Sequence, residues 1–129
     1  MNKLITLTAL ICLALQCETK QASPEPESGV LTCGVKDPAK ELAWLRDIIT
    51  KAEADRTTKT YSGNYIGTIY LEKFNDKDVF HTDMAMGSGG LAMRVYYCDG
   101  QSVSFTDNDQ MLAFVRSLKK TNLIYTNTP

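Results

Sequence analysis

Histidine is almost absent from this chain, since His81 is the single one among 129 residues. This excludes every catalytic triad and every metal site that needs two histidines. His81 and Asp83 fall on one face of a predicted strand, where they resemble an acid–base pair. The favoured interpretation of that face is an exposed polar surface near a strand edge. The sequence therefore predicts no enzyme, no metal site and no cofactor.

Complete catalytic and ligand-binding motifs are also lacking. Ser88 stands in a glycine-rich loop, but Met86 occupies the position where a nucleophile elbow needs glycine. The same loop lacks the spacing and the following helix of a phosphate-binding loop. Two aspartate pairs begin like a calcium loop without its later glycine and glutamate, so turn and helix-cap roles are favoured for Asp76 with Asp78 and for Asp107 with Asp109.

Neither sign of charge dominates, because 14 lysines and arginines stand against 15 aspartates and glutamates. A nucleic-acid-binding protein needs a basic face, and strong attraction to anionic lipid needs an excess of positive charge. The composition therefore predicts no nucleic-acid partner. Any attachment to a membrane must come from acyl chains.

No hydrophobic run reaches the length of about 20 residues that a transmembrane helix needs. The stretch Leu4–Leu15 has 12 residues and follows Lys3, as in a signal peptide. We therefore interpret residues 1–16 as a lipoprotein signal peptide and Cys17 as the lipid-bearing first residue of the mature chain. Gln16 is unusual before such a cysteine, and the alternative is a secreted protein cleaved near residue 17 or later.

Residues 18–28 contain no large hydrophobic side chain, and their two prolines alternate with glutamates. Such a segment cannot bury a core and is typical of a tether. Fully extended, at about 3.1 Å per residue, it spans roughly 30 Å. We expect residues 17–28 to be the anchor cysteine and its tether, and residues 29–129 to form a single domain.

Two of the four cysteines remain for the folded domain, because Cys12 lies in the signal peptide and Cys17 carries the anchor. An even pair in an exported protein favours a disulfide between Cys33 and Cys98. Chain-entropy arithmetic values that bridge at about 4 kcal/mol. Two free buried thiols are the alternative.

The periodicity of hydrophobic residues predicts a helix at each end of the domain. The first is expected from Pro38 to about Ala54, with Asp37 as its N-cap. The second is expected after Asp107, which forms a capping box with Gln110. The first helix carries a hydrophobic stripe made of Leu42, Leu45, Ile48, Ile49 and Ala52.

Alternating patterns between the helices predict strands near residues 65–72, 91–97 and 102–105. A turn at residues 75–78 favours a returning strand at 79–84, and a short last strand is expected at 123–125. Hairpin-connected strands with helices at both ends favour an α+β fold. We expect an antiparallel sheet of four or five strands, with the N-terminal and C-terminal helices packed on one face.

Tyrosine is frequent for so small a domain. It supplies a large contact area at little entropic cost, so a recognition surface is one interpretation, and ordinary packing in a sheet is the other. The candidates for a binding surface are Tyr65, Tyr70, Tyr96 and Tyr97. Trp44 lies beside the stripe of the first helix and is expected to be structural.

Three short motifs stand in residues 33–100: Cys33-Gly34 followed by Pro38, then Glu41-Leu42-Ala43-Trp44-Leu45, then Tyr97-Cys98-Asp99-Gly100. In these the chain resembles a group of small lipoproteins from Bacteroidetes-type bacteria. Members of that group often carry further cysteines in the loop before the third strand, which residues 87–90 lack here. The resemblance implies a place in the cell envelope and no established activity.

These observations favour an envelope lipoprotein that acts as a non-catalytic binding or structural module with an envelope protein as partner. The alternative is a secreted or anchored inhibitor, or an immunity-type protein, that blocks an enzyme. A small hydrolase centred on His81 is the least favoured interpretation. The expected location is the periplasmic or surface side of a membrane, to which Cys17 attaches the chain.

Overall fold

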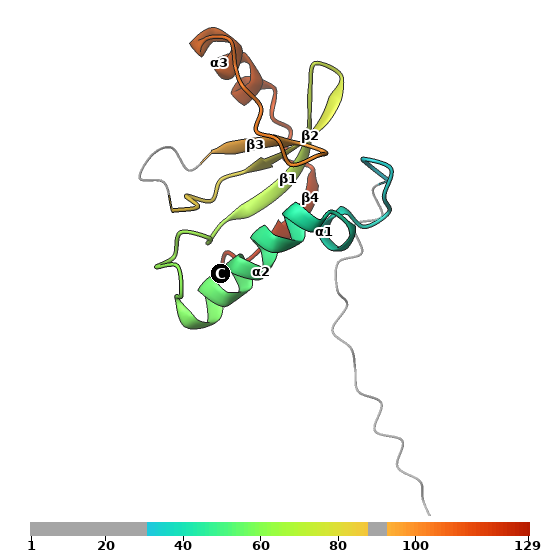
Figure 1. Ribbon diagram of the computed structural model, residues 1–129. Helices are drawn as coiled ribbons and strands as arrows, with labels where there is room; N and C mark the ends of the chain where they lie inside the picture. Colours follow the sequence, from blue (N-terminus) through green and yellow to red (C-terminus); the bar gives the residue numbers. More distant parts are fainter. Residues whose placement is uncertain (1–30, 88–92) are drawn as a thin grey trace, which may run out of the picture.

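The computed structural model describes residues 31–87 and 93–129. In these ranges the elements follow in the order α1 (Pro38–Glu41), α2 (Ala43–Thr58), β1 (Thr68–Phe74), β2 (Lys77–Thr82), β3 (Arg94–Tyr97), α3 (Asn108–Ser117) and β4 (Asn122–Thr126) (Figure 1). The strands form one antiparallel sheet in the order β3-β2-β1-β4. The predicted α+β class is confirmed. The predicted signal peptide, anchor, tether and Ser88 lie outside the described residues.

The long helices α2 and α3 cover opposite faces of the sheet, whereas the sequence predicted both on one face (Figure 1). Leu71 lies opposite Phe80 in the β1–β2 register, and both belong to the hydrophobic cluster under α2. Val79 directs its side chain to the other face, where it packs with Phe114 of α3. Residues 79–82 are all buried, and such a continuous run needs cover on both faces.

The first predicted helix is divided at Leu42, whose backbone is extended (φ −83°, ψ 110°). Asp37 makes no side-chain cap hydrogen bond; instead the Glu41 carboxylate accepts from the backbone N–H groups of Lys36 (3.0 Å) and Asp37 (2.7 Å). Because the chain turns at Leu42, α1 lies beside β4 while α2 begins a new axis. α2 then runs beyond the predicted end, to Thr58.

The segment predicted as a fourth strand forms only an isolated bridge, between Ser102 and Tyr96. Its side chains still point as the alternation predicted, because Val103 and Phe105 pack against the cluster under α3 and Ser102 and Ser104 are exposed. The backbone pairing with β3 ends at Val103. The sheet therefore has four strands, and the fourth is the predicted last strand, β4.

The start of α3 and the last strand are confirmed. Asp107 accepts from the Gln110 backbone N–H (2.8 Å), and the Gln110 side chain accepts in return from the backbone N–H of Thr106 (2.9 Å). The predicted strand at 123–125 is the centre of β4, which pairs with β1. Along the chain, the C-terminal helix α3 therefore lies between β3 and β4, which are the two edge strands of the sheet.

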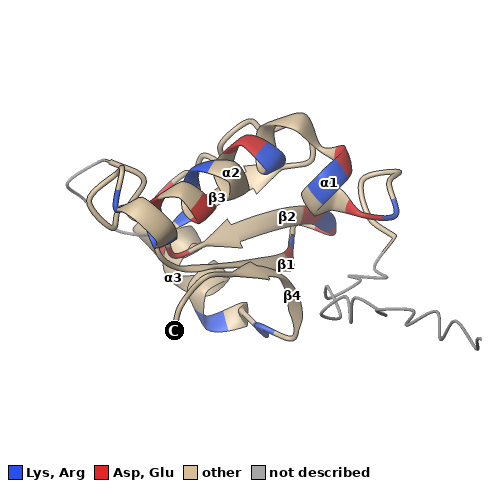
Figure 2. Cartoon of the chain, turned by 90° about the horizontal axis from the view of Figure 1, so that it is seen from below, with Lys and Arg blue, Asp and Glu red and all other residues tan. Residues whose placement is uncertain are grey.

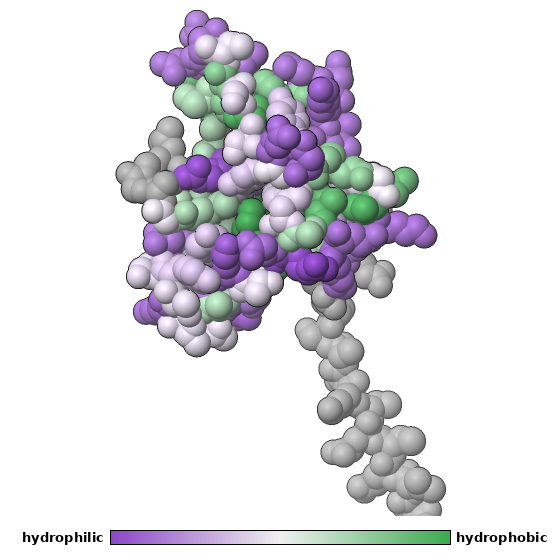
Figure 3. Space-filling view, viewed as in Figure 1, coloured by the Kyte–Doolittle hydropathy of each residue, from purple (hydrophilic) through white to green (hydrophobic). Residues whose placement is uncertain are grey.

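Cys33 and Cys98 form a disulfide with their Cα atoms 5.5 Å apart, as predicted. It joins the segment before α1 to the turn after β3. Figure 3 shows hydrophobic side chains gathered over that first segment, where Leu31 is 72% exposed. The outward side of α2 is mostly hydrophilic in the same view.

Candidate binding groove

The four tyrosines proposed as a binding surface do not lie together. Tyr96 and Tyr97 are neighbours in β3 and point to opposite faces, the first into the cluster under α2 and the second into the cluster under α3. Tyr70 of β1 shares the face of Tyr97, because it lies opposite His81 in the β1–β2 register. Tyr65 packs against the cluster under α2. All four are half-buried, so each has packing contacts of its own.

Trp44 is held by packing and by one hydrogen bond, in accord with the structural role expected of it. Its indole Nε1–H donates to the carbonyl oxygen of Cys98 (3.0 Å). The indole packs edge-on against Phe80, with the ring centroids 5.4 Å apart, and against Tyr96, with the ring centroids 5.3 Å apart. A Cβ on Gly100 would lie 2.7 Å from the indole, so glycine lets the turn after β3 close on the ring.

The prediction that His81 lies on an exposed face near a strand edge was wrong. β2 lies between β1 and β3, and His81 is 3% exposed. Its ring packs against that of Phe114 of α3, with the ring centroids 6.4 Å apart, and its Nδ1 has no hydrogen-bond partner among the residues that the structure describes. Asp83, the proposed acid partner, is exposed. Its Oδ1 accepts a hydrogen bond from the backbone N–H of Thr68 (2.6 Å), so this carboxylate oxygen is engaged by the backbone.

Burial lowers the pKa of His81, and the nearby Lys120 lowers it further, against smaller opposing effects of Asp83 and Glu72. The unfolded chain takes up a proton at the ordinary value of 6.5, which the folded chain resists. We therefore expect the free energy of unfolding to fall as the pH falls below about 6.5. Urea unfolding at about pH 5 to 8 measures this, and His81→Leu should remove that part of the slope. Identical pH profiles for the two proteins would contradict the assignment.

Two buried polar side chains fix the ends of α2 and β4. The Asp55 carboxylate accepts from the backbone N–H groups of Tyr61 (2.9 Å), Gly63 (3.0 Å) and Tyr65 (2.9 Å), which orders the loop after α2. Burial alone would raise the pKa of Asp55, but these three donors hold it below its ordinary value.

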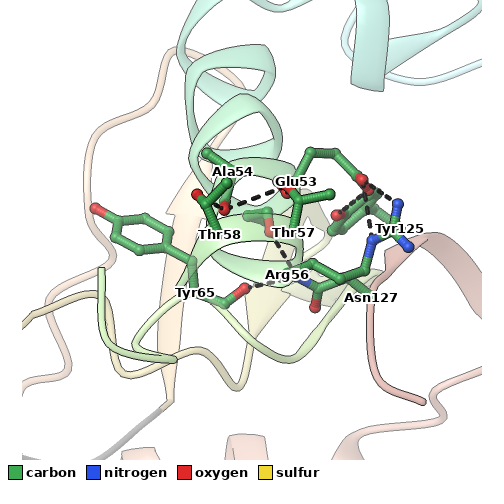
Figure 4. A network of polar contacts seen from close by, with 9 residues as sticks. Glu53, Ala54, Arg56, Thr57, Thr58, Tyr65, Tyr125 and Asn127 are labelled. Atoms are coloured by element: carbon green, nitrogen blue, oxygen red, sulfur yellow. Dashed lines mark hydrogen bonds and ion pairs between the residues drawn. The ribbon is translucent and has the colours of Figure 1, made fainter. Parts of the chain in front are cut away.

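Asn127 fixes the position of β4 against α2 (Figure 4). Its Oδ1 accepts from the Gly67 backbone N–H (2.8 Å), and its Nδ2 donates to the carbonyl oxygens of Ala52 (2.9 Å) and Tyr65 (3.0 Å). A single buried amide thereby ties the strand end to the helix and to the residues before β1. The spacing between α2 and β4 is fixed as a result.

The two edges of the sheet differ in how they are covered. On the outer side of β3, the Val103 N–H donates to the Val95 carbonyl (2.8 Å) and the Tyr97 N–H to the Gln101 carbonyl (2.9 Å). β4 pairs with β1 on one side, and no strand of the described residues pairs with its other side. Figure 2 shows β4 as the outermost strand. An edge strand of this kind presents unpaired N–H and C=O groups to an incoming strand.

β4 also lacks the residues with which edge strands usually prevent pairing. Its sequence, Asn122–Thr126, holds no charged residue and no proline. Leu123, Ile124 and Tyr125 instead favour extended structure. Leu123 is 45% exposed, so hydrophobic surface is available at this edge.

A groove of ≈520 Å³ runs between β4 and the helices α1 and α2. Its lining combines hydrophobic and charged side chains. The lining residues are Asp37, Ala39, Lys40, Arg46, Ile49, Glu53 and the stretch Leu123–Thr126. The groove therefore lies directly alongside the strand edge that is left unpaired.

The end of the groove near the C-terminus of α2 is closed by a polar network (Figure 4). The Tyr125 hydroxyl donates to Glu53 (2.5 Å), and Arg56 donates to the same carboxyl group (2.6 Å). The hydrogen bond from Tyr125 and then that from Arg56 hold the pKa of Glu53 below its ordinary value. Burial, and then Glu53, raise the pKa of the Tyr125 hydroxyl, so it stays a donor. The negative charge of Glu53 is thus already engaged.

A second hollow, of ≈490 Å³, lies beside the disulfide and is lined in part by Asp78 and Tyr97. The carboxylate of Asp78 is already bound by the Thr32 hydroxyl (2.6 Å) and by Lys73 (2.7 Å). The carboxylate in that hollow is therefore already engaged by a hydrogen bond and an ion pair from the same chain. The groove along β4 adds an unpaired backbone edge to its lining and is the better candidate for a binding site.

Sequence reasoning did not single out this groove. One signal for it was present: Arg46, Ile49 and Glu53 recur at helical spacing along the edge of the hydrophobic stripe to which Ile49 belongs. The other was the lack of charge in the last strand. Neither shows which strand becomes the uncovered edge, because that depends on the order of strands in the sheet.

Comparison with protein-family models, with curated proteins and with solved structures finds no match to this chain. In the part of the chain that the structure describes, no group of three or more His, Cys, Asp or Glu side chains is arranged to hold a metal ion. None of the helices in the same ranges has the length and apolar character needed to cross a bilayer. The Cys33–Cys98 disulfide is typical of a protein outside the cytoplasm.

Proposed function

We propose that this protein is a lipid-anchored binding module of the cell envelope, and that it takes up an extended segment of another envelope protein along β4. The observation that carries the proposal is an uncharged edge strand that pairs with no second strand of the described residues and borders a groove of ≈520 Å³. No catalytic chemistry is needed for this role.

Addition of a strand to a sheet edge obtains affinity from main-chain hydrogen bonds and specificity from alternate side chains. The five residues of β4 offer a paired length of about 17 Å at roughly 3.4 Å per residue. Every second side chain of the incoming segment would face α2, and one of these would meet Ile49. Asn127 keeps the strand and the helix at a fixed spacing, so the groove is formed before the segment arrives.

The anchor is the second component of this proposal. It rests on Cys17, which directly follows the hydrophobic run, and on the tether that separates it from the domain. Labelled palmitate should enter the wild-type protein and not the Cys17→Ala variant. Equal labelling of both would remove the lipoprotein assignment and leave a secreted binding module.

Binding along β4 is tested by placing a lysine on the strand. Unconstrained peptides of about ten residues, displayed as a random library, are selected on the mature full-length chain. We expect Leu123→Lys to lower the binding affinity for the selected peptides tenfold or more, because a lysine on an edge strand opposes strand pairing. The matched control is Leu112→Lys on α3, since Leu112 is 43% exposed and Leu123 is 45% exposed.

The control variant should bind the selected peptides as the wild type does. Peptides that bind the wild type and both variants equally would show that β4 is not the site. A library that yields no peptide sensitive to Leu123→Lys would likewise reject the proposed function.

A further inference from the structure

Resting on the proposed function, we infer that the segment bound along β4 is acidic and pairs a carboxylate with Arg46. The proposal commits to one occupant: an extended segment of a partner protein, with an acidic side chain at the α1 end of the groove and an apolar one beside it.

The charges at the groove point to Arg46. Lys40 pairs with Asp37 (3.3 Å), at the rim beside α1. At the other end, Arg56 and Tyr125 engage Glu53. The positive and negative charges at these two places are therefore matched within the chain.

Arg46 is an exposed cation and forms no ion pair with any residue that the structure describes. The acid next to it, Asp47, is bound by Lys51 (2.7 Å). The Nη1 of Arg46 donates to the carbonyl oxygen of Lys40 (3.1 Å), which holds the guanidinium at the groove. The remaining guanidinium N–H groups are suited to a carboxylate, which binds this fork in two-point fashion.

The spacing along α2 gives the order of side chains in the bound segment. At about 1.5 Å per helical residue, Ile49 lies about 4.5 Å along the axis from Arg46, and Glu53 lies about 6 Å farther. Side chains on one face of a strand are about 7 Å apart. An acidic residue opposite Arg46 therefore leaves the next inward side chain near Ile49, where an apolar group fits. A second acid near Glu53 would meet a like charge.

A second copy of this chain fits the groove less well. Residues Asn122–Thr126 contain no acid, so two β4 strands paired with each other would bring no carboxylate from the partner strand to Arg46. The charge at the groove is thus better matched by a different, acidic segment.

The test uses the peptides selected on the mature full-length chain. We expect the selected sequences to be enriched in Asp or Glu at one position, with an apolar residue two positions away. Arg46→Gln should lower the binding affinity for such a peptide about fivefold, which is the effect of losing one exposed ion pair. Arg46→Glu should lower it about tenfold or more. The matched control is Arg116→Glu, which changes an arginine in the last turn of α3. That helix lies on the opposite face of the sheet from α2 and the groove.

A charge swap separates pairing from general damage. A peptide whose acidic residue is replaced by lysine should bind the Arg46→Glu variant better than it binds the wild type. Peptides that are sensitive to Leu123→Lys but carry no acidic preference and ignore Arg46→Glu would overturn this inference and leave the proposed function standing. Peptides insensitive to Leu123→Lys would reject both, and a concentration-dependent dimer abolished by Leu123→Lys would assign the edge to a second copy.

Discussion

Replacing Trp44 with alanine should lower the free energy of unfolding by about 3 kcal/mol, the lower part of the range for large aromatic side chains. The lower part applies because the ring is half-buried. The change removes the contacts with Phe80 and Tyr96 and leaves the Cys98 carbonyl without its indole donor. Urea unfolding should show a lower midpoint with a similar slope.

Trp44→Phe is the matched control, because it keeps an aromatic ring but removes the N–H donor. We expect it to cost about 1 kcal/mol, the net value of one hydrogen bond. If Trp44→Ala leaves the midpoint unchanged, the indole does not hold the turn after β3 against α2. It would then be available as a contact residue.

Removing the disulfide should have the largest effect on stability. The bridge spans a sequence separation of 65, for which chain-entropy arithmetic gives about 4 kcal/mol. It ties the segment before α1 to the turn after β3, and that turn contacts Trp44. The double variant Cys33→Ser with Cys98→Ser should therefore unfold at a much lower urea concentration.

Reduction provides the control for that experiment. A thiol reductant should bring the wild type close to the stability of the double variant and leave the double variant unchanged. Intact masses after alkylation report the bridge directly. Two alkylated thiols in the folded, unreduced wild type would show that the bridge does not form.

Local patterns predicted the helices and most strands correctly because they depend on near neighbours. Leu45, Ile48 and Ala52 lie on one helix face at any position of that helix in the fold, and all three are buried. Asp107 and Gln110 form their capping box through residues within four positions of each other. The disulfide followed from counting the cysteines left after export.

Features that depend on strand order could not be read from such patterns. His81 and Asp83 share a strand face, which favoured an exposed polar surface, but β2 lies between two strands and Phe114 of α3 packs on His81. The sequence does not show that the C-terminal helix packs on the face opposite α2, since this depends on which face the chain crosses between the two edge strands β3 and β4. The candidate groove was missed for the same reason, because it needs both the unpaired edge of β4 and the adjoining side of α2.

Amide hydrogen exchange on the mature chain, with and without a selected peptide, tests the binding site most directly. If a segment adds to the sheet edge, the outward-facing N–H groups of Asn122–Thr126 become hydrogen-bonded and exchange more slowly. β3 should be unchanged, because its outer side is already bonded to residues 101–103. Protection in β4 is the result predicted here. Protection elsewhere, with β4 exchanging as in the free protein, would contradict the binding of a segment along this strand.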